Sequence, residues 1–159
     1  MVLAGSLALA ISALGQSEWL SQCGQCLSPS VYSKSGIGTS HAVAEAKVTR
    51  KDAEGWCENW SPEDKACLQQ QLASEAGKNY RATADCSKGK ITAIDGNAYT
   101  YGGVWTTDVG KGRSKWRDAS GKLVGQDEAS GGLAIAQQWE LLCPSSTGAK
   151  PASRANINH

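Results

Sequence analysis

The fold class is decided by residues 49–86, which read TRKDAEGWCENWSPEDKACLQQQLASEAGKNYRATADC. Apolar side chains recur at the helical period of about 3.6 residues before Gly77 and at the strand period of about 2 after it. A glycine just past the last periodic residue is a common way for a helix to end. The stretch therefore predicts helices followed by a strand, which is typical of an α+β protein.

Two helix starts are recognisable in this stretch. Thr49 and Asp52 are spaced so that each side chain can accept a hydrogen bond from the other's free backbone amide, which predicts a helix to about Trp60. Ser61 and the proline after it provide a capping hydroxyl and a good first helical residue, so a second helix should run to Ala76. The residues expected to face the core are Ala53, Trp56, Cys57, Trp60, Leu68, Leu72 and Ala76.

Strands are predicted on both sides of the helices. Residues 42–48 alternate small apolar with charged side chains, which favours a half-exposed strand over the first turns of a helix. After Gly77, alternating runs joined by glycine turns predict antiparallel hairpins, and residues 133–143 show the clearest alternation. The predicted strands in this part cover residues 80–86, 91–94, 98–105, 113–117, 122–125 and 133–143.

The predicted architecture is α+β: two short N-terminal helices packed on an antiparallel β-sheet or small open barrel of about five or six strands, stabilised by disulfides. Residues 41–144 are expected to form this single domain. Residues 16–40 contain a Cys-x-x-Cys segment and a Ser/Gly-rich loop over residues 27–40. Residues 145–159 lack large apolar side chains apart from Ile157, so we expect a disordered tail.

An apolar run at the N-terminus indicates the compartment. Residues 2–14 are about as long as the core of a signal peptide and too short to span a bilayer as a helix. Ala13 and Gly15 are small residues at the positions that signal peptidase reads, so residues 1–15 are interpreted as a signal peptide. An ordinary core helix is the alternative interpretation. We expect a periplasmic or secreted protein without a transmembrane segment in the mature chain.

Six cysteines support the same compartment. Spacing favours two bonds: Cys57–Cys67 would join the two predicted helices, and Cys86–Cys143 would join the first strand after them to the last. Cys23 and Cys26, in Cys-Gly-Gln-Cys, are left for a bond between themselves, exchange into the other pairs, or a redox couple. A redox sulfur usually lies at a helix N-terminus that follows a strand, and no such pattern surrounds this motif.

Charge and composition argue against several function classes. The formal net charge is +1, which provides no electrostatic footprint for nucleic acid. His41 and His159 lack a second paired-ligand motif, so we expect no metal and no other cofactor. Acid pairs such as Asp127 with Glu128, or Asp95 with Asp108, are interpreted as solvated carboxylates rather than as a glycosidase pair. No catalytic residue is therefore predicted, and a binding protein is favoured over an enzyme.

Aromatic residues mark a candidate binding surface. The chain has no Phe, six Trp and four Tyr, and these two residue types suit contacts with protein partners or sugar rings. Core packing is expected for Trp56, Trp60 and Trp139, whereas the segment over residues 99–117 combines aromatic side chains with a basic cluster. The candidate binding residues are Tyr99, Tyr101, Trp105, Arg113, Lys115, Trp116 and Arg117.

The sequence thus predicts a non-enzymatic binding or inhibitor-like module whose partner is a protein or an envelope glycan. One alternative is a thiol–disulfide redox protein that uses Cys23 and Cys26, and another is a dedicated envelope glycan-binding module. The redox alternative requires a solvent-accessible, reactive sulfur. The binding hypotheses require an exposed surface patch.

Overall fold

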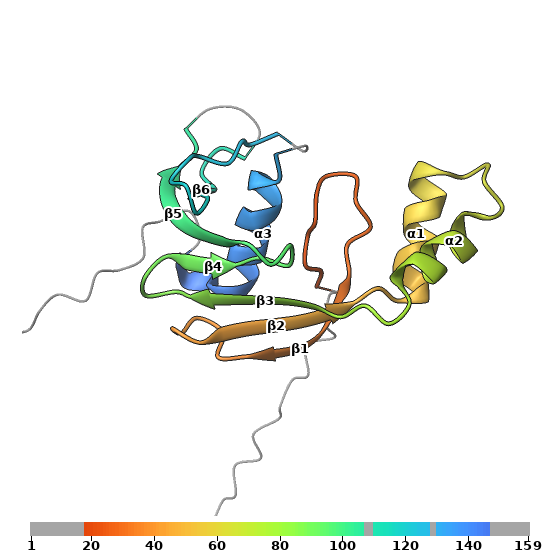
Figure 1. Cartoon of the computed structure of the whole chain (residues 1–159), viewed down its shortest axis with the longest axis horizontal. Coiled ribbons are helices and arrows are strands. Elements are labelled where there is room, and N and C mark those ends of the chain that lie inside the picture. The colour runs from red at the N-terminus through yellow and green to blue at the C-terminus, as the bar shows by residue number, and fades with distance from the viewer. Residues whose placement is uncertain (1–17, 107–109, 128–129, 147–159) are drawn as a thin grey trace, which may run out of the picture.

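Residues 18–106, 110–127 and 130–146 are described by the computed structural model, and they contain one six-stranded sheet with three α-helices (Figure 1). The strands lie in the sheet in chain order, and each neighbouring pair is antiparallel. An α+β fold with an antiparallel sheet is therefore confirmed. The elements are β1 (Ser30–Ser35), β2 (Ala42–Lys47), α1 (Arg50–Trp60), α2 (Cys67–Glu75), β3 (Tyr80–Asp85), β4 (Lys90–Thr92), β5 (Ala98–Val104), β6 (Ser114–Arg117), α3 (Gly132–Leu142) and the short 3₁₀ helix η1 (Pro144–Ser146).

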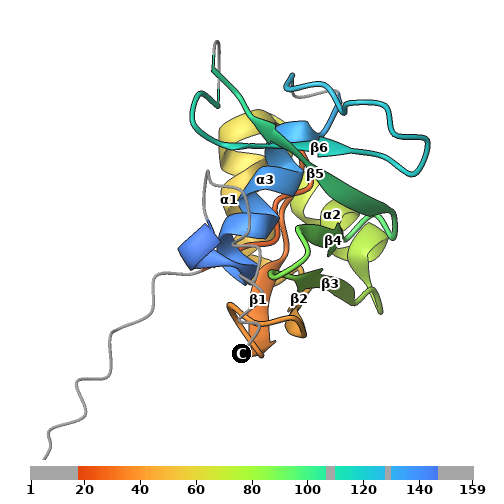
Figure 2. The same cartoon turned by 90° about the vertical axis from the view of Figure 1, so that its left-hand side faces the viewer.

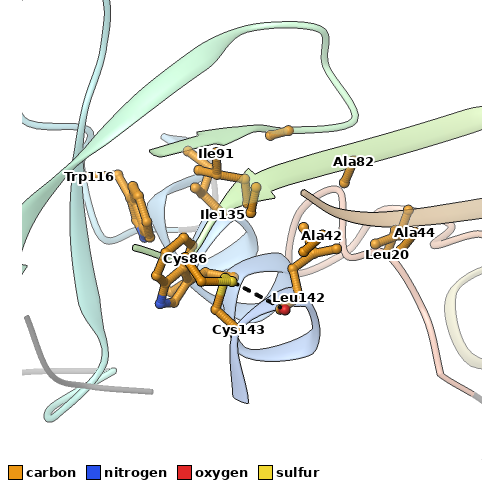
Figure 3. Packing of buried hydrophobic residues seen from close by; sticks show 14 of the residues in the cluster. Leu20, Ala42, Ala44, Ala82, Cys86, Ile91, Trp116, Ile135, Leu142 and Cys143 are labelled. Carbon is orange, nitrogen blue, oxygen red and sulfur yellow. Dashed lines mark hydrogen bonds between the residues drawn. A yellow bond between two sulfur atoms is a disulfide. The ribbon is translucent and has the colours of Figure 1, made fainter. Parts of the chain in front are cut away.

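One face of the sheet is covered by α3, which lies along it in both views (Figures 1 and 2). We call this side the covered face and the opposite side the open face. Alternate residues of β2, β3 and β4 point to the covered face and are buried: Ala42, Ala44, Ala46, Ala82, Ala84 and Ile91. Small side chains on β2 and β3 let the helix approach closely. Larger side chains of α3 and β6 complete the core, among them Ile135, Trp139, Leu142 and Trp116 (Figure 3).

The predicted strand over residues 133–143 is wrong, because Gly132–Leu142 form α3. The run is apolar enough to match both periods: Ile135, Trp139 and Leu142 recur at helical spacing, while alternate residues also fit one strand face. Burial decides between them, since α3 is buried on most of its circumference. Its Ala, Leu, Gln and Glu residues also favour a helix over a strand.

The predicted loop over residues 27–40 contains a strand that the prediction missed. Ser30–Ser35 form β1, which pairs with β2 at the edge of the sheet. An edge strand needs little apolar surface, and Val31 is the β1 side chain that packs against the core. The serine-rich composition therefore concealed it. Gly36 turns the chain back toward β2 with a φ of 59°.

The capping box predicted at the first helix is confirmed. Thr49 Oγ1 accepts from the Asp52 amide at 3.2 Å, and Asp52 Oδ2 accepts from the Thr49 amide at 2.8 Å. The second helix begins later than predicted, at Cys67 instead of after Ser61. Residues 61–66 form turns, in which Asp64 Oδ1 accepts from the Ala66 amide at 2.9 Å. The proline signal therefore marks a turn rather than a helix start.

The α1–α2 pair lies beyond the ends of β2 and β3, while α3 lies on the sheet (Figure 1). The helix that packs on the sheet is therefore C-terminal, which corrects the predicted packing of two N-terminal helices there. The two N-terminal helices contact each other instead and are joined by the Cys57–Cys67 disulfide. Trp60 at the end of α1 is 51% exposed, so its predicted place in the core is also wrong.

The hairpins after Gly77 form largely as predicted. Residues 122–125, however, make an isolated bridge between Leu123 and Arg117 rather than a strand. The predicted signal peptide and most of the predicted tail, residues 147–159, lie outside the described residues. Within the residues that the structure describes, no helix has the length and apolar character needed to span a membrane.

Candidate functional site

The predicted binding residues are separated by a β-bulge between β5 and β6. The register shifts between Tyr101 and Gly103, and Gly103 adopts a φ of 114°, which glycine tolerates best. An extra residue in one strand reverses the side to which later side chains point. Tyr99, Tyr101 and Trp105 lie at alternate positions in the sequence, but because of the bulge Trp105 points to the other side of the sheet.

Trp116 belongs to the core, which corrects its place among the candidate binding residues. Its side chain is 1% exposed, and its ring centroid lies 6.1 Å from that of Tyr101 and 5.0 Å from that of Trp139. Trp116 Nε1 donates to Ser114 Oγ at 3.0 Å, so its buried polar group has a partner. Trp116 therefore holds the covered face together and is not available to a binding partner.

Trp105 and Lys115 lie on the open face. Neighbouring residues of a strand point to opposite sides of the sheet, so Lys115 points away from Trp116. Lys115 Nζ lies 4.8 Å from the ring centroid of Trp105, which is a cation–π contact. Arg117 points to the same side and donates from Nη1 to the Gly121 carbonyl at 2.9 Å.

Arg113 takes a different position, against α3. Its Nε lies 3.3 Å from Glu140 Oε1. Burial raises the pKa of the Glu140 carboxyl, and the nearby guanidinium acts in the opposite direction. The seven predicted residues are thus distributed over the core, the open face and the side of α3, and do not form one patch.

A row of small residues crosses four strands on the open face. In register, Val43 pairs with Thr83, Thr83 with Thr92, and Thr92 with Ala98. The outward positions of a solvated sheet are usually polar, and here they carry methyl groups beside hydroxyls. We call these four residues the small row. The sequence analysis missed them, although Val, Thr and Ala at outward positions of alternating strands were a usable signal.

Charged residues flank the small row on both sides. The pairs that border it in register are Asp85–Lys90, Lys90–Thr100, Thr100–Arg117 and Glu45–Arg81. Opposite charges placed directly across neighbouring strands stabilise the sheet. These charged pairs also place both positive and negative side chains beside the small row.

The small row forms part of the floor of a groove of about 690 Å³. Ser40 and His41 border it on one side, and the turn over residues 118–121 borders it on another. A groove of this size lies within the range of about 300–1,000 Å³ found for ligand sites. His41 Nδ1 lies 2.8 Å from Ser40 Oγ, and the histidine is exposed.

Two carboxylates at the groove are engaged in turns. Asp85 Oδ1 accepts from Ser87 Oγ, and Asp118 Oδ1 accepts from Ser120 Oγ, both at 2.6 Å. These hydrogen bonds lower the pKa of both carboxyl groups. Both acids are therefore ionised at neutral pH and act as fixed charges, whereas a general acid needs a raised pKa.

A smaller pocket of about 350 Å³ lies between α1 and the chain that leads into β1. Trp19 and Trp56 line it, together with Asp52 and Asn59, and Trp19 is 54% exposed. Burial alone would raise the pKa of Asp52, but hydrogen bonds from Thr49, Ser30 and Trp19 hold it below its ordinary value. The pocket thus combines two indole rings with an ionised carboxylate and an amide.

Two of the three disulfides are the pairs that the sequence spacing favours. Cys57–Cys67 connects α1 to α2, and Cys86–Cys143 connects the chain after β3 to the end of α3. The partner of β3 in this bond is a helix end and not the predicted last strand. Cys23 and Cys26 bond to each other in the loop that precedes β1.

Within the described residues, no group of three or more His, Cys, Asp and Glu side chains is arranged to hold a metal ion. The features that characterise the open-face groove are its shape, the small row and the flanking charges.

No protein-family model, no curated protein and no solved structure matches this chain.

Proposed function

We propose that this protein is a non-enzymatic binding module of the periplasm or the extracellular space, and that it binds a protein partner on the open face of its sheet. The observation that carries the proposal is the small row, because β-branched and small residues face outward on strands whose other side is already packed against α3. A sheet face with an apolar strip gains free energy when a partner covers it.

The charge pattern favours a polypeptide as this partner. Protein interfaces combine an apolar centre with a polar rim, and the small row has charged pairs on both sides. Both signs of charge border the small row, so a partner of mixed charge fits better than a uniformly charged polymer. Three disulfides support the proposed compartment, since such bonds persist mainly under oxidising conditions.

Site-specific photocrosslinking tests the binding face. A photoreactive residue at Thr92, in the small row, is expected to capture a partner in the envelope or medium of the producing cell. The same residue at Gln70, exposed on α2, is the matched control and should not capture it. Equal capture from both positions would contradict the proposal.

Affinity measurement with the purified partner makes the test quantitative. Thr92→Arg fills the groove with a long charged side chain, and we expect Kd to rise by about tenfold or more, as loss of a central contact does. Gln70→Arg adds the same charge away from the groove and should leave Kd unchanged. An unchanged Kd for Thr92→Arg would exclude the open face as the binding surface.

A glycan is the second candidate ligand, and the pocket between Trp19 and Trp56 favours it. Indole faces stack on sugar rings, while carboxylate and amide groups accept and donate hydrogen bonds to sugar hydroxyls. Titration with soluble peptidoglycan fragments, followed by tryptophan fluorescence, is the test. Trp19→Ala should abolish a saturable signal, whereas Trp60→Ala, equally exposed but not lining the pocket, should retain it.

A further inference from the structure

The Cys23–Cys26 disulfide differs from the other two in its exposure. Cys57, Cys67, Cys86 and Cys143 are all buried, with exposed fractions of 9% or less. Cys26 is exposed, and Cys23 is half-buried. Thiol–disulfide exchange requires direct approach of an attacking sulfur to a sulfur of the bond. Of the three disulfides, Cys23–Cys26 is the one that a macromolecular thiol can reach without unfolding the protein.

Contacts outside the disulfide hold the loop that carries it. At the base of the loop, the Leu20 amide donates to the Pro29 carbonyl at 3.1 Å. Trp56 Nε1 of α1 donates to the Gln25 carbonyl at 2.9 Å, and Gln138 Nε2 of α3 donates to the Ser21 carbonyl at 2.6 Å. The loop is therefore fastened to two helices by groups that do not depend on the sulfur–sulfur bond.

The N-terminus of α3 lies beside this disulfide. Cys23 and Cys26 line a cavity of about 230 Å³ together with Gly131, Leu133 and Ala134, the N-cap and first-turn residues of α3. The first amides of a helix have no acceptor within the helix. In α3 the Gly132 amide donates to the Gly125 carbonyl at 3.0 Å, and no side chain caps the helix. A helix N-terminus stabilises an adjacent thiolate because its amides carry partial positive charge.

The loop and helix end are brought together by the tertiary structure. In Figure 1 the loop stands between α3 and α1, with its tip level with the start of α3. Cys26 also lines a second cavity of about 310 Å³, which includes Tyr80, Ile94 and Gly131. Cys26 thus lines two cavities, which provide room for the side chains that flank a partner's cysteine.

We propose that Cys23–Cys26 is a thiol–disulfide exchange site whose substrate is a protein dithiol. This inference is independent of the open-face proposal, because it concerns a different surface and a covalent reaction. The exposure of Cys26, the independent anchoring of the loop and the helix end beside the pair carry it together.

The exchange proceeds in two balanced steps. A thiolate of the partner attacks Cys26 Sγ, which forms a mixed disulfide and releases Cys23 as a thiolate beside the α3 N-terminus. The second thiolate of the partner then attacks the partner's own sulfur in that bond and releases Cys26. The partner loses two electrons and becomes a disulfide, while Cys23 and Cys26 gain two electrons and end as thiols or thiolates. The reverse reaction uses the same steps.

Glutathione is a suitable probe for selectivity. The full chain is equilibrated in graded mixtures of reduced and oxidised glutathione, alkylated, and mapped by mass spectrometry. We expect Cys23–Cys26 to open first, while the circular dichroism spectrum stays native and the two buried disulfides remain closed. Opening of Cys23–Cys26 only together with the buried bonds or with unfolding would overturn the proposal.

Two single-cysteine variants test the direction of attack. Cys23→Ser leaves Cys26 able to form a mixed disulfide with glutathione that no neighbour resolves, and Cys26→Ser leaves the less exposed Cys23. We expect the mixed disulfide to form about tenfold faster on Cys26, in line with the dependence of exchange on access. Equal rates on the two cysteines would contradict the assigned order of attack.

A charge variant tests the influence of the helix end. Asp127 lines the same cavity, and its Oδ1 accepts from the Ser130 amide at 2.8 Å, a role that asparagine can keep. Asp127→Asn removes a negative charge near the released thiolate and should shift the glutathione equilibrium about threefold toward the reduced form. Asp64→Asn, in the turn before α2, is the control and should shift nothing. A disulfide with only a structural role would respond to neither variant.

Discussion

The two faces of the sheet are built from the same strands but differ in burial. On β4, Ile91 points to the covered face and is 2% exposed, whereas Thr92 points to the open face and is exposed. The covered face is packed against α3, and its contacts hold the fold together. The open face carries the small row. One set of alternate residues thus holds the fold, and the proposed function assigns the other set to binding.

Loss of the Cys86–Cys143 bond should have the largest effect on the covered face, since it fastens the end of α3 to the sheet. Replacing both cysteines with alanine should lower the free energy of unfolding by about 4 kcal/mol, because the bond closes a long loop. Denaturant unfolding measures the change. The Cys57–Cys67 bond closes a shorter loop, so the same replacement there should cost about 3 kcal/mol. A larger loss for the shorter loop would contradict this order.

Ile91→Ala tests packing on the covered face at a single position. Removal of this buried side chain should lower the free energy of unfolding by about 3 kcal/mol through lost burial and a residual cavity. Thermal and denaturant unfolding provide the measurement. A loss below about 1 kcal/mol would show that the core beneath α3 is not close-packed at this position.

A substitution at Tyr99 tests the edge of the core. The Tyr99 ring packs on the core, and its hydroxyl donates to Asp95 Oδ2 at 2.6 Å. Burial, together with this bond, raises the pKa of Tyr99 to about 12. Tyr99→Phe should therefore cost about 1 kcal/mol near pH 8.

The pH dependence of this difference follows from the sign of the shift. Because the pKa of Tyr99 is higher in the folded protein, its stabilisation is complete below pH 10 and is lost as pH rises to about 12. Burial also raises the pKa of Tyr80 and of Tyr101, so ultraviolet absorbance should show that Tyr99→Phe loses one of several late-ionising tyrosines. Tyr32→Phe, at an exposed position, is the control for stability and should have no effect.

Thr92→Ala should have the smallest effect on stability. Its side chain lies on the open face, so the free energy of unfolding should change by less than about 0.5 kcal/mol. The contrast with Ile91→Ala, one residue away, is the sharpest comparison of the two faces. A loss for Thr92→Ala as large as that for Ile91→Ala would mean that the open face also supports the fold.

Local signals were sufficient for part of the fold. The capping box of α1 and the hairpins after Gly77 depend on residues close in sequence, and both are present. The sequence analysis was wrong at two points that residue spacing could not resolve. A bulge at Gly103 reverses the alternation, and a buried apolar run such as that of α3 satisfies helix and strand periods together.

The error at α3 also concealed the environment of Cys23–Cys26. A strand over residues 133–143 has no N-terminal dipole, so the sequence analysis found no helix end for this pair. In the structure, Gln138 of α3 bonds to the Ser21 carbonyl, across 117 residues of chain. Long-range contacts of this kind leave no periodic trace in the sequence.

The sequence by itself determined the α+β class, the start of α1, most hairpins and two of the three disulfides, Cys57–Cys67 and Cys86–Cys143. These follow from period, capping and spacing, which are properties of neighbouring residues. The tertiary structure alone decided which face of the sheet is covered, that residues 132–142 form a helix, and that its N-terminus lies beside Cys23 and Cys26. The physical reason is burial: a side chain's surroundings depend on elements that the chain brings together from far apart, and these contacts override local preference.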